Sequence, residues 1–177
     1  MKNSDGEKAE IWDGYNRDET LAGVDLVRGR AVPKGLYHLV CEVLVQHTDG
    51  EWLLMQRSYT KRDNRGRYVA TAGGAALKGE NKFDCVKREL FEETGIAADE
   101  FTELGCFVYD EDRCIIHVFY CVTDCEKKSI RLQPYETIAY KWVSERNFVR
   151  FINSDRMMPR QKQQYHDFFE KRGLLRK

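Results

Sequence analysis

The sequence predicts an α/β or α+β sandwich, in which strands surround one central helix and further helices close the C-terminus. Three observations support this fold class. A strand-turn-strand pattern opens the main part of the chain, a helix with clear start and stop signals follows, and strand and helix patterns alternate after it. The 177 residues contain no internal repeat and only three prolines, so nothing indicates a linker between two domains.

An N-terminal arm is expected over residues 1–35. Residues 1–10 are charged and are expected to be frayed. The stretch Ile11–Arg30 carries turn signals at Asp13-Gly14 and Arg28-Gly29. The arm is therefore expected to form a small hairpin before the main domain begins.

The main domain is expected over residues 36–177. Its first strand covers Tyr37–Gln46, a turn follows at Thr48-Asp49-Gly50, and a returning strand covers Trp52–Arg57. A polar loop and a short extended piece then lead to Gly73-Gly74. We therefore expect a hairpin, a loop and a glycine pair before the central helix.

The central helix has well-marked ends. Asn81 is a good N-cap, Asp84 lies three residues on as in a capping box, and Gly95 suits the position after a helix that ends at Thr94. Apolar side chains at i, i+3 and i+7 form a stripe that is expected to face the sheet: Phe83, Val86 and Leu90.

Strand and helix patterns continue beyond the central helix. Strands are expected near Leu104–Tyr109, Cys114–Thr123 and Ile138–Val143. Helices are expected near Ser144–Ile152 and Pro159–Lys171. The domain therefore ends in helices that can cover a sheet.

The composition disfavours several classes of function. Lys plus Arg number 29, as do Asp plus Glu, so no excess positive field attracts nucleic acid. The charged N-terminus lacks an apolar leader, and no run of about 18 apolar residues suits a membrane. The six cysteines form no C-x-x-C pair, which favours buried free thiols over a zinc or redox motif. A cytoplasmic protein is expected.

Three acids gather on one side of the central helix. Glu89, Glu92 and Glu93 are related by i+3 and i+4, and each like-charged pair costs roughly 0.2–0.5 kcal/mol without a cation nearby. Carboxylates are natural ligands of Mg²⁺ and Mn²⁺, which also bind phosphates. The alternative is a solvated acidic face, partly paired with Lys87 and Arg88.

The acids belong to a longer pattern with the spacing G-x5-E-x7-R-E-U-x-E-E-x-G-U, where U is a bulky aliphatic residue. Every position matches within residues 74–96: Gly74, Glu80, Arg88, Glu89, Leu90, Glu92, Glu93, Gly95 and Ile96. This segment resembles the Nudix box, so the chain is similar to the MutT-like Nudix hydrolases. The resemblance implies an α/β/α sandwich with a mixed β-sheet between helices.

The resemblance also implies a metal site. Glu89, Glu92 and Glu93 would ligate Mg²⁺ or Mn²⁺, and the backbone carbonyl of Gly73 would be a further ligand. Gly73 and Gly74 let the backbone approach a metal or phosphate closely. Arg88 would hold a neighbouring glutamate by a charge-assisted bond. The number of ions and the glutamate that serves as general base stay open.

Outside the box, residues 37–148 resemble the Nudix branch related to isopentenyl-diphosphate isomerase. Arg57 and Lys61 match cations that contact the diphosphate, and Glu136 matches a late acid that serves as metal ligand or base. Solvated loop charges and a plain surface glutamate are the alternatives.

The isomerase residues themselves are missing. The reactive cysteine of an isomerase would fall at Gly73 and a histidine metal ligand at Ala75. His38 matches one histidine of that metal site, but it lacks these partners. Hydrolysis is therefore expected rather than isomerisation.

The expected function is hydrolysis of a diphosphate bond in a small nucleoside-diphosphate-type substrate by metal-activated water. Isopentenyl-diphosphate isomerisation is one alternative, and a non-catalytic Nudix module that senses a nucleotide is another. The expected partner is the small-molecule substrate, with neither nucleic acid nor membrane, and the family resemblance leaves room for a homodimer.

Overall fold

The computed structural model describes residues 10–61 and 64–175. The frayed segment that the sequence predicts at the N-terminus lies, except for its last residue, outside the described residues. The strands are β1 (Ile11–Tyr15), β2 (Leu21–Val27), β3 (His38–His47), β4 (Trp52–Arg57), β5 (Tyr68–Val69), β6 (Thr71–Ala75), β7 (Thr102–Tyr109), β8 (Cys114–Thr123) and β9 (Thr137–Val143). The helices are α1 (Lys82–Thr94), the 3-10 helix η1 (Lys127–Ser129), α2 (Glu145–Ile152), α3 (Pro159–Gln164) and α4 (His166–Lys171).

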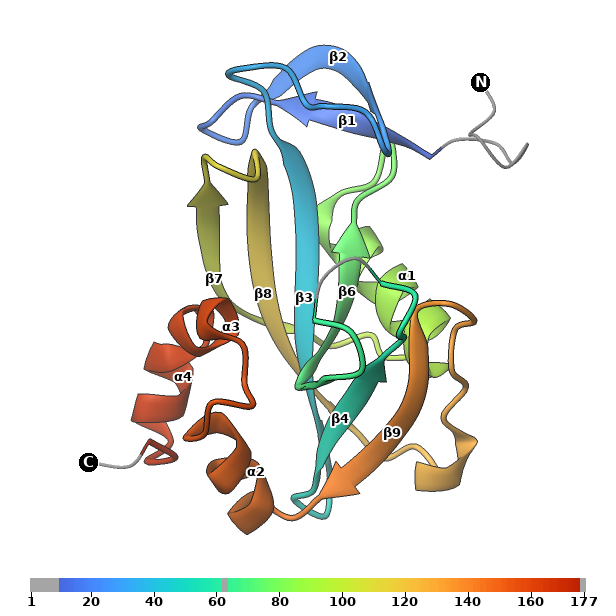
Figure 1. Ribbon diagram of the computed structural model, residues 1–177, viewed down its shortest axis with the longest axis vertical. Helices are drawn as coiled ribbons and strands as arrows, with labels where there is room; N and C mark the ends of the chain where they lie inside the picture. The colour runs from blue at the N-terminus through green and yellow to red at the C-terminus, as the bar shows by residue number, and fades with distance from the viewer. Residues whose placement is uncertain (1–9, 62–63, 176–177) are drawn as a thin grey trace.

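A mixed sheet forms the centre of the molecule (Figure 1). Its main path runs β5-β4-β3-β8-β7, while β6 pairs with β3 and β9 pairs with β4. The two longest strands, β3 and β8, are parallel, from His38 opposite Cys114 to His47 opposite Thr123. The other pairs in this sheet are antiparallel. The mixed sheet expected from the family resemblance is therefore confirmed.

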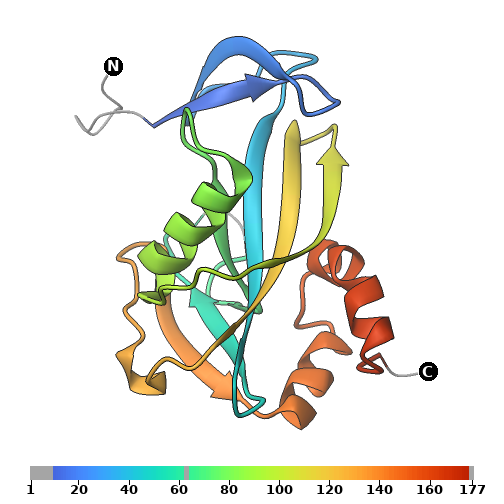
Figure 2. The same cartoon turned by 180° about the vertical axis from the view of Figure 1, so that it is seen from behind.

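Each face of the sheet carries its own apolar core. Because side chains alternate along a strand, Val43 and Val45 of β3 pack toward α1, whereas Leu44 packs toward the C-terminal helices. On that second face, Trp52 stacks on Phe148 of α2 with ring centroids 4.2 Å apart. Helix α1 lies in front of the sheet in Figure 2 and behind it in Figure 1. The sheet is thus enclosed between helices, as the α/β/α prediction requires.

The ends of α1 agree with the sequence prediction. The Asn81 side chain accepts hydrogen bonds from the N–H groups of Phe83 and Asp84 at 2.8 and 3.0 Å, and Gly95 ends the helix with a φ of 75°. The capping box does not form, because the Asp84 carboxylate accepts from the Asn81 side chain instead. The predicted apolar stripe is only partly right: Val86 is fully buried, but Phe83 is 43% exposed near the helix start.

Two other local predictions need correction. Asp13-Gly14 is not a turn: it lies inside β1 at a register shift, and the hairpin turns later, where the Asn16 N–H bonds to the Thr20 carbonyl at 2.8 Å. The C-terminal helical pattern is divided between α3 and α4 at Tyr165, a fully buried ring whose ψ of 5° leaves regular helix geometry. The turn after β2 at Arg28-Gly29 is confirmed.

The β1–β2 hairpin packs across the end of the sheet beside α1 (Figure 1). Tyr15 forms a bridge with Tyr37, and Trp12 stacks on His38 at 4.6 Å. The Ile11 carbonyl accepts from the N–H of Lys78, in the loop that leads into α1. The hairpin is therefore attached to the segment that begins the Nudix-like box.

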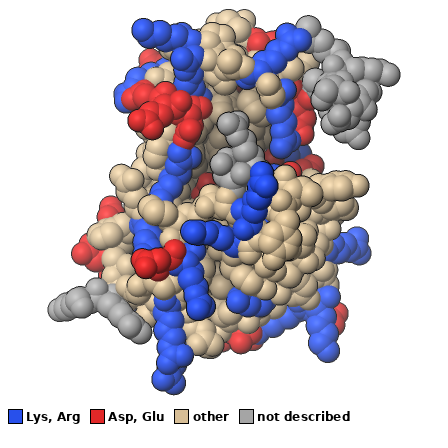
Figure 3. All heavy atoms as spheres, in the orientation of Figure 1, with Lys and Arg blue, Asp and Glu red and all other residues tan. Residues whose placement is uncertain are grey.

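The surface is mixed in charge, and the helices are short or polar. Basic and acidic side chains are interspersed over the face seen in Figure 3, in line with the equal numbers of the two charges. Among the described residues, no helix has the length and apolar character needed to cross a membrane.

Candidate functional site

The glycine pair of β6 lets the strand lie close to its neighbours. A Cβ built on Gly73 would lie 2.8 Å from the Cα of Glu42 on β3, and nearer still to the carbonyl oxygen of Cys41. A Cβ on Gly74 would lie 2.5 Å from the Glu89 carboxylate of α1. Glycine is thus required sterically at Gly73 for strand pairing, whereas a side chain at Gly74 would displace the end of the Glu89 side chain.

Arg88 connects the residues around it into one network. Its guanidinium donates to Glu80 at 2.6 and 2.9 Å, to Glu89 at 2.8 Å, to Glu92 at 3.1 Å and to the Ala75 carbonyl at 3.0 Å. The expected bond from this arginine to a neighbouring glutamate is therefore present. The network also joins β6, the loop before α1 and α1 itself, which gives the acids a defined position.

Glu93 is the most enclosed of the three predicted acids. It is 8% exposed, although charged side chains are seldom this buried without a partner. Burial, together with the nearby charges of Glu89 and Glu136, raises its pKa to about 8, while a hydrogen bond from the Gly73 backbone opposes the rise. Burial also raises the pKa of Glu89, against the opposing influence of Arg88. These acids occupy a site that disfavours bare negative charge.

The predicted site residues meet on one cavity of about 310 Å³. All nine line it: Arg57, Lys61, Gly73, Gly74, Arg88, Glu89, Glu92, Glu93 and Glu136. They come from β4 and the loop after it, from β6, from α1 and from the loop before β9. A cavity of this volume is in the range of small-molecule sites.

Cations face the acids across this cavity. Lys61 forms a close ion pair with Glu136, and Arg28 lies 3.9 Å from the same carboxylate. Arg28 also bonds to Glu10 at 2.7 Å, which fixes it on the hairpin side of the cavity. Arg57 lines the cavity from the end of β4. The cavity wall thus offers both oxygen ligands for a cation and positive groups for an anion.

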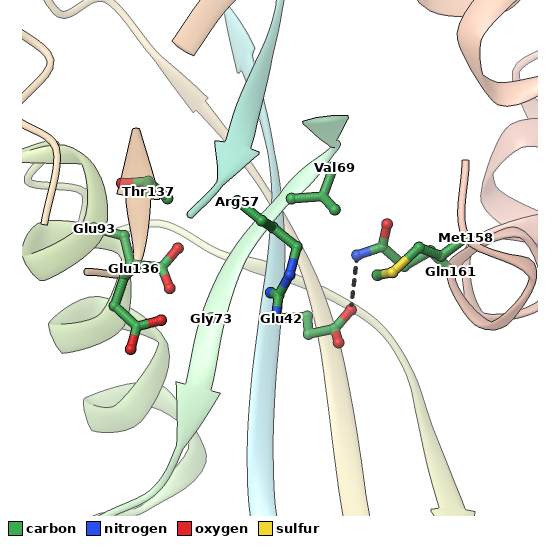
Figure 4. Close-up of a pocket in the computed structure, with 9 residues that line it drawn as sticks. All are labelled: Glu42, Arg57, Val69, Gly73, Glu93, Glu136, Thr137, Met158 and Gln161. Carbon is green, nitrogen blue, oxygen red and sulfur yellow. Dashed lines mark hydrogen bonds between the residues drawn. The ribbon is translucent and has the colours of Figure 1, made fainter. Parts of the chain in front are cut away.

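A smaller pocket of about 60 Å³ adjoins the cavity and shares Arg57, Gly73, Glu93 and Glu136 with it. Figure 4 shows Glu93 and Glu136 on one side and Glu42 and Gln161 on the other, with Arg57 between them. The Gln161 side chain donates to the Glu42 carboxylate at 3.5 Å. Burial raises the pKa of Glu42, and Gln161, Arg160 and Arg57 oppose that rise. The pocket thus brings the Glu42–Gln161 pair and Glu93 of α1 to the same space.

Sequence reasoning did not assign several of the lining residues. The hairpin contributes Glu10, Trp12 and Arg28, and α3 contributes Gln161. One signal was available for Glu42, since it is a charged residue in an otherwise apolar strand pattern. The hairpin residues had no comparable signal, because their role depends on the hairpin folding back over the sheet.

The cysteines agree only in part with the expectation of buried thiols. Cys41, Cys85, Cys114 and Cys121 are buried, and all six are free. Cys106, on the outer strand β7, is exposed, and Cys125 is half-buried.

Comparison with known proteins identifies the family. The NUDIX domain family model matches residues 36–168. The chain is 27% identical over 150 residues to the uncharacterized Nudix hydrolase lmo0368 of Listeria monocytogenes, covering 85% of this chain and 89% of that protein.

Two solved structures share the fold. DR0079 from Deinococcus radiodurans has a TM-score of 0.65 at 17% identity, covering 81% of this chain and 88% of that one. The MutT protein from Methanosarcina mazei Go1 has a TM-score of 0.60 at 26% identity, covering 77% and 95%. The match is to the family as a whole, so the resemblance to the isomerase branch stays a prediction. This chain belongs to the Nudix family and is a Nudix hydrolase, an enzyme that acts on pyrophosphate bonds.

Proposed function

We propose that this hydrolase cleaves a diphosphate bond in a small nucleoside-diphosphate-type substrate, with Mg²⁺ or Mn²⁺ as cofactor and water as nucleophile. The observation that carries the proposal is the convergence of α1 acids with cations from other segments on one cavity. Carboxylates bind divalent ions, and Arg and Lys bind phosphate oxygens. A cavity with both suits a complex of a divalent ion with a diphosphate.

The available donors fit such an ion. Glu89, Glu92 and Glu93 offer only oxygen ligands, and Mg²⁺ keeps several waters, so the carboxylates need not all contact it directly. Burial raises the pKa of Glu89 and Glu93, so a cation would offset a cost that the folded protein carries without one. When bound, the ion lowers the pKa of a water molecule and offsets charge on the leaving phosphate.

Glu93 is our first candidate to accept the proton of the attacking water. Glu93 has an enclosed position on the cavity wall, and a bound cation would lower its raised pKa, which would leave the carboxylate ionised and able to accept a proton. The hydrogen bond from the Gly73 backbone favours its ionised form. Arg88 acts as a positioning residue, since its bonds hold Glu89 and Glu92.

Arg57, Lys61 and Arg28 are proposed to bind the diphosphate. Lys61 and Arg28 both face Glu136 in the protein alone. Phosphate oxygens would give these cations a second anionic partner and weaken their hold on Glu136. Glu136 could then turn to the reacting centre, either as a ligand or as a base.

The backbone at Gly73 argues against isomerase chemistry. The isomerase cysteine would fall at this position, where a Cβ has no room beside the backbone of Cys41 and Glu42. A cysteine at residue 73 would force β6 away from β3. Hydrolysis by water needs no side chain there.

A substrate screen tests the proposed function. Purified protein is incubated with a panel of nucleoside diphosphates linked to sugars, nucleosides or phosphate, with Mg²⁺ and Mn²⁺ in separate arms and EDTA as control. We expect phosphate-containing products from at least one compound, only with metal present. Folded protein that is inert over the whole panel, or equally active in EDTA, would overturn the proposal.

A further inference from the structure

A second cluster of ligating side chains lies under the turn of the β1–β2 hairpin, apart from the catalytic cavity. Glu19 comes from that turn, Cys106 from β7 and His117 from β8, and their ligand atoms all lie within 4.8 Å of one another. Cys106 and His117 are direct partners in the β7–β8 ladder. None of the three lines the catalytic cavity.

A strand irregularity brings a fourth residue to the cluster. Residues three apart in a regular strand point to opposite faces of a sheet. The register of β7 shifts between Glu103 and Gly105, and such a shift inserts an extra residue. Glu103 and Cys106 therefore both reach the His117 ring.

The surroundings of His117 resemble those of a metal-bound histidine. The residue is 1% exposed, and its Nδ1 lies 2.7 Å from the Glu103 carboxylate, which Lys82 holds at 2.8 Å. A carboxylate at one ring nitrogen fixes the N–H there and leaves the lone pair of the other nitrogen for a metal. That other nitrogen, Nε2, lies 2.8 Å from Glu19 Oε1 and 3.7 Å from Cys106 Sγ.

The separations of the donor atoms suit one small ion. In a tetrahedral zinc site, bonds of about 2.0–2.3 Å place the ligand atoms about 3.3–3.5 Å apart. The observed separations are 2.8 Å between His117 Nε2 and Glu19, 3.7 Å between Nε2 and Cys106 Sγ, and 3.9 Å between Sγ and Glu19 Oε2. The 2.8 and 3.9 Å separations involve different oxygens of Glu19, so a rotation of this carboxylate would bring one oxygen to the ion.

We propose that Glu19, Cys106 and His117 form a binding site for a zinc-type divalent ion, with Glu103 orienting the histidine. A thiolate and an imidazole select zinc and similar transition metals, whereas the oxygen ligands of α1 select Mg²⁺ or Mn²⁺. Three protein ligands leave a fourth position for water, and the exposure of Cys106 gives water access to the cluster. The chain thus has two metal sites of different chemistry.

Such an ion would fasten the hairpin to the sheet. Glu19 belongs to the hairpin turn, whereas the other two ligands belong to the sheet. The same hairpin carries Glu10, Trp12 and Arg28 into the wall of the catalytic cavity. Bound metal would therefore stabilise the N-terminal side of that cavity from a distance.

Cobalt titration of the full chain tests this site. Metal-stripped protein is titrated with Co²⁺ and followed by absorption spectroscopy, then with Zn²⁺ as competitor. We expect one thiolate-to-cobalt charge-transfer band together with the intense d–d bands of four-coordinate cobalt, both removed by Zn²⁺. Absence of the charge-transfer band at saturating Co²⁺ would overturn the proposal.

Matched variants locate the signal. Cys106→Ser should abolish the charge-transfer band, and Glu19→Gln should weaken cobalt binding at least tenfold. Cys125→Ser, a control at another cysteine that is not fully buried, and Glu93→Gln, at the catalytic helix, should both leave the band unchanged. A band that persists in Cys106→Ser would refute the assignment. Circular dichroism verifies folding, and the readout does not depend on hydrolase activity.

Discussion

The two ends of the Nudix box hold carboxylates in opposite electrostatic settings: Glu80 is half-buried and Glu93 is buried. Glu80, just before α1, accepts two bonds from Arg88 and one from the Leu77 N–H; burial alone would raise its pKa, but these bonds hold it below the ordinary value. Glu93, in the last turn of α1, has burial and two other carboxylates around it, and its pKa rises to about 8.

The difference distinguishes a carboxylate that stabilises the structure from one that is available for chemistry. The carboxylate of Glu80 is stabilised by partners that the protein itself supplies, so it fixes the loop before α1. The carboxylate of Glu93 depends more on a partner from outside, so it is available to a cation or a proton. Residue type does not distinguish the two; their burial and their hydrogen-bond partners do.

The largest expected effect is on turnover. Glu93→Gln should lower kcat by about 10²–10⁴-fold, since the amide neither accepts a proton nor ligates a cation well. Steady-state kinetics on the best panel substrate measures this. Glu100→Gln, a control variant at an exposed position, should have the kcat of the wild type. A Glu93→Gln enzyme of full activity would assign the chemistry to another residue.

The next effect is on folding and concerns the glycine pair. Gly73→Ala should destabilise the protein by about 1–3 kcal/mol or more, because its Cβ meets the β3 backbone. Gly74→Ala is the matched variant: its Cβ meets only the end of the Glu89 side chain, so activity should fall with less loss of stability. Urea unfolding and kinetics of both variants distinguish these outcomes. Equal losses of stability would contradict the difference.

The third expected effect is on the pH dependence of stability, measured in EDTA so that no metal is bound. It compares the two carboxylates directly. A lowered pKa gives Glu80 a stabilisation that is present above pH 4.5 and is lost as pH falls through its folded pKa. Glu93 behaves oppositely: stability is full below pH 4.5 and declines as pH rises toward 8, by up to about 1.4 kcal/mol per pH unit.

The variants should therefore show opposite trends. Glu80→Gln should cost about 1–2 kcal/mol at pH 7 and progressively less in acid, whereas Glu93→Gln should be neutral at pH 4.5 and stabilising above pH 8. Free energies of unfolding across this range provide the check. A Glu93→Gln curve parallel to that of the wild type would contradict the raised pKa.

The smallest expected effect is on substrate recognition in the adjoining pocket. Glu42→Gln should raise KM about tenfold for substrates whose polar end group donates to this carboxylate, because a hydrogen bond to a charged group contributes about 1.5–3 kcal/mol. Because Gln161 donates to the same carboxylate, Gln161→Ala is the companion variant. A uniform fall in kcat over the panel, with KM unchanged, would instead place Glu42 in the chemistry.

Much of the fold could be predicted from local signals. The Asn81 cap and the Gly95 stop predicted the ends of α1, and the polar turn at Asp49-Gly50 predicted the connection between β3 and β4. The predicted pairing of these two strands is only partly right: Gln46 pairs with Trp52, but β4 pairs along its length with β9. The nine site residues assigned from the box and its neighbourhood share one cavity. Interactions between distant segments were the part that sequence could not provide. Glu19 and His117 meet only because the hairpin folds onto β8, which no spacing along the chain reveals.

The hairpin has a consequence for how this enzyme is compared with others. The family match begins at residue 36, yet Glu10, Trp12 and Arg28 line the cavity from before that boundary. An alignment confined to the shared domain would omit one wall of this cavity. A chain that begins at residue 36 would keep the acids of α1 but lose Arg28 opposite them. Ligand preference should therefore be compared between orthologues that retain the leading segment.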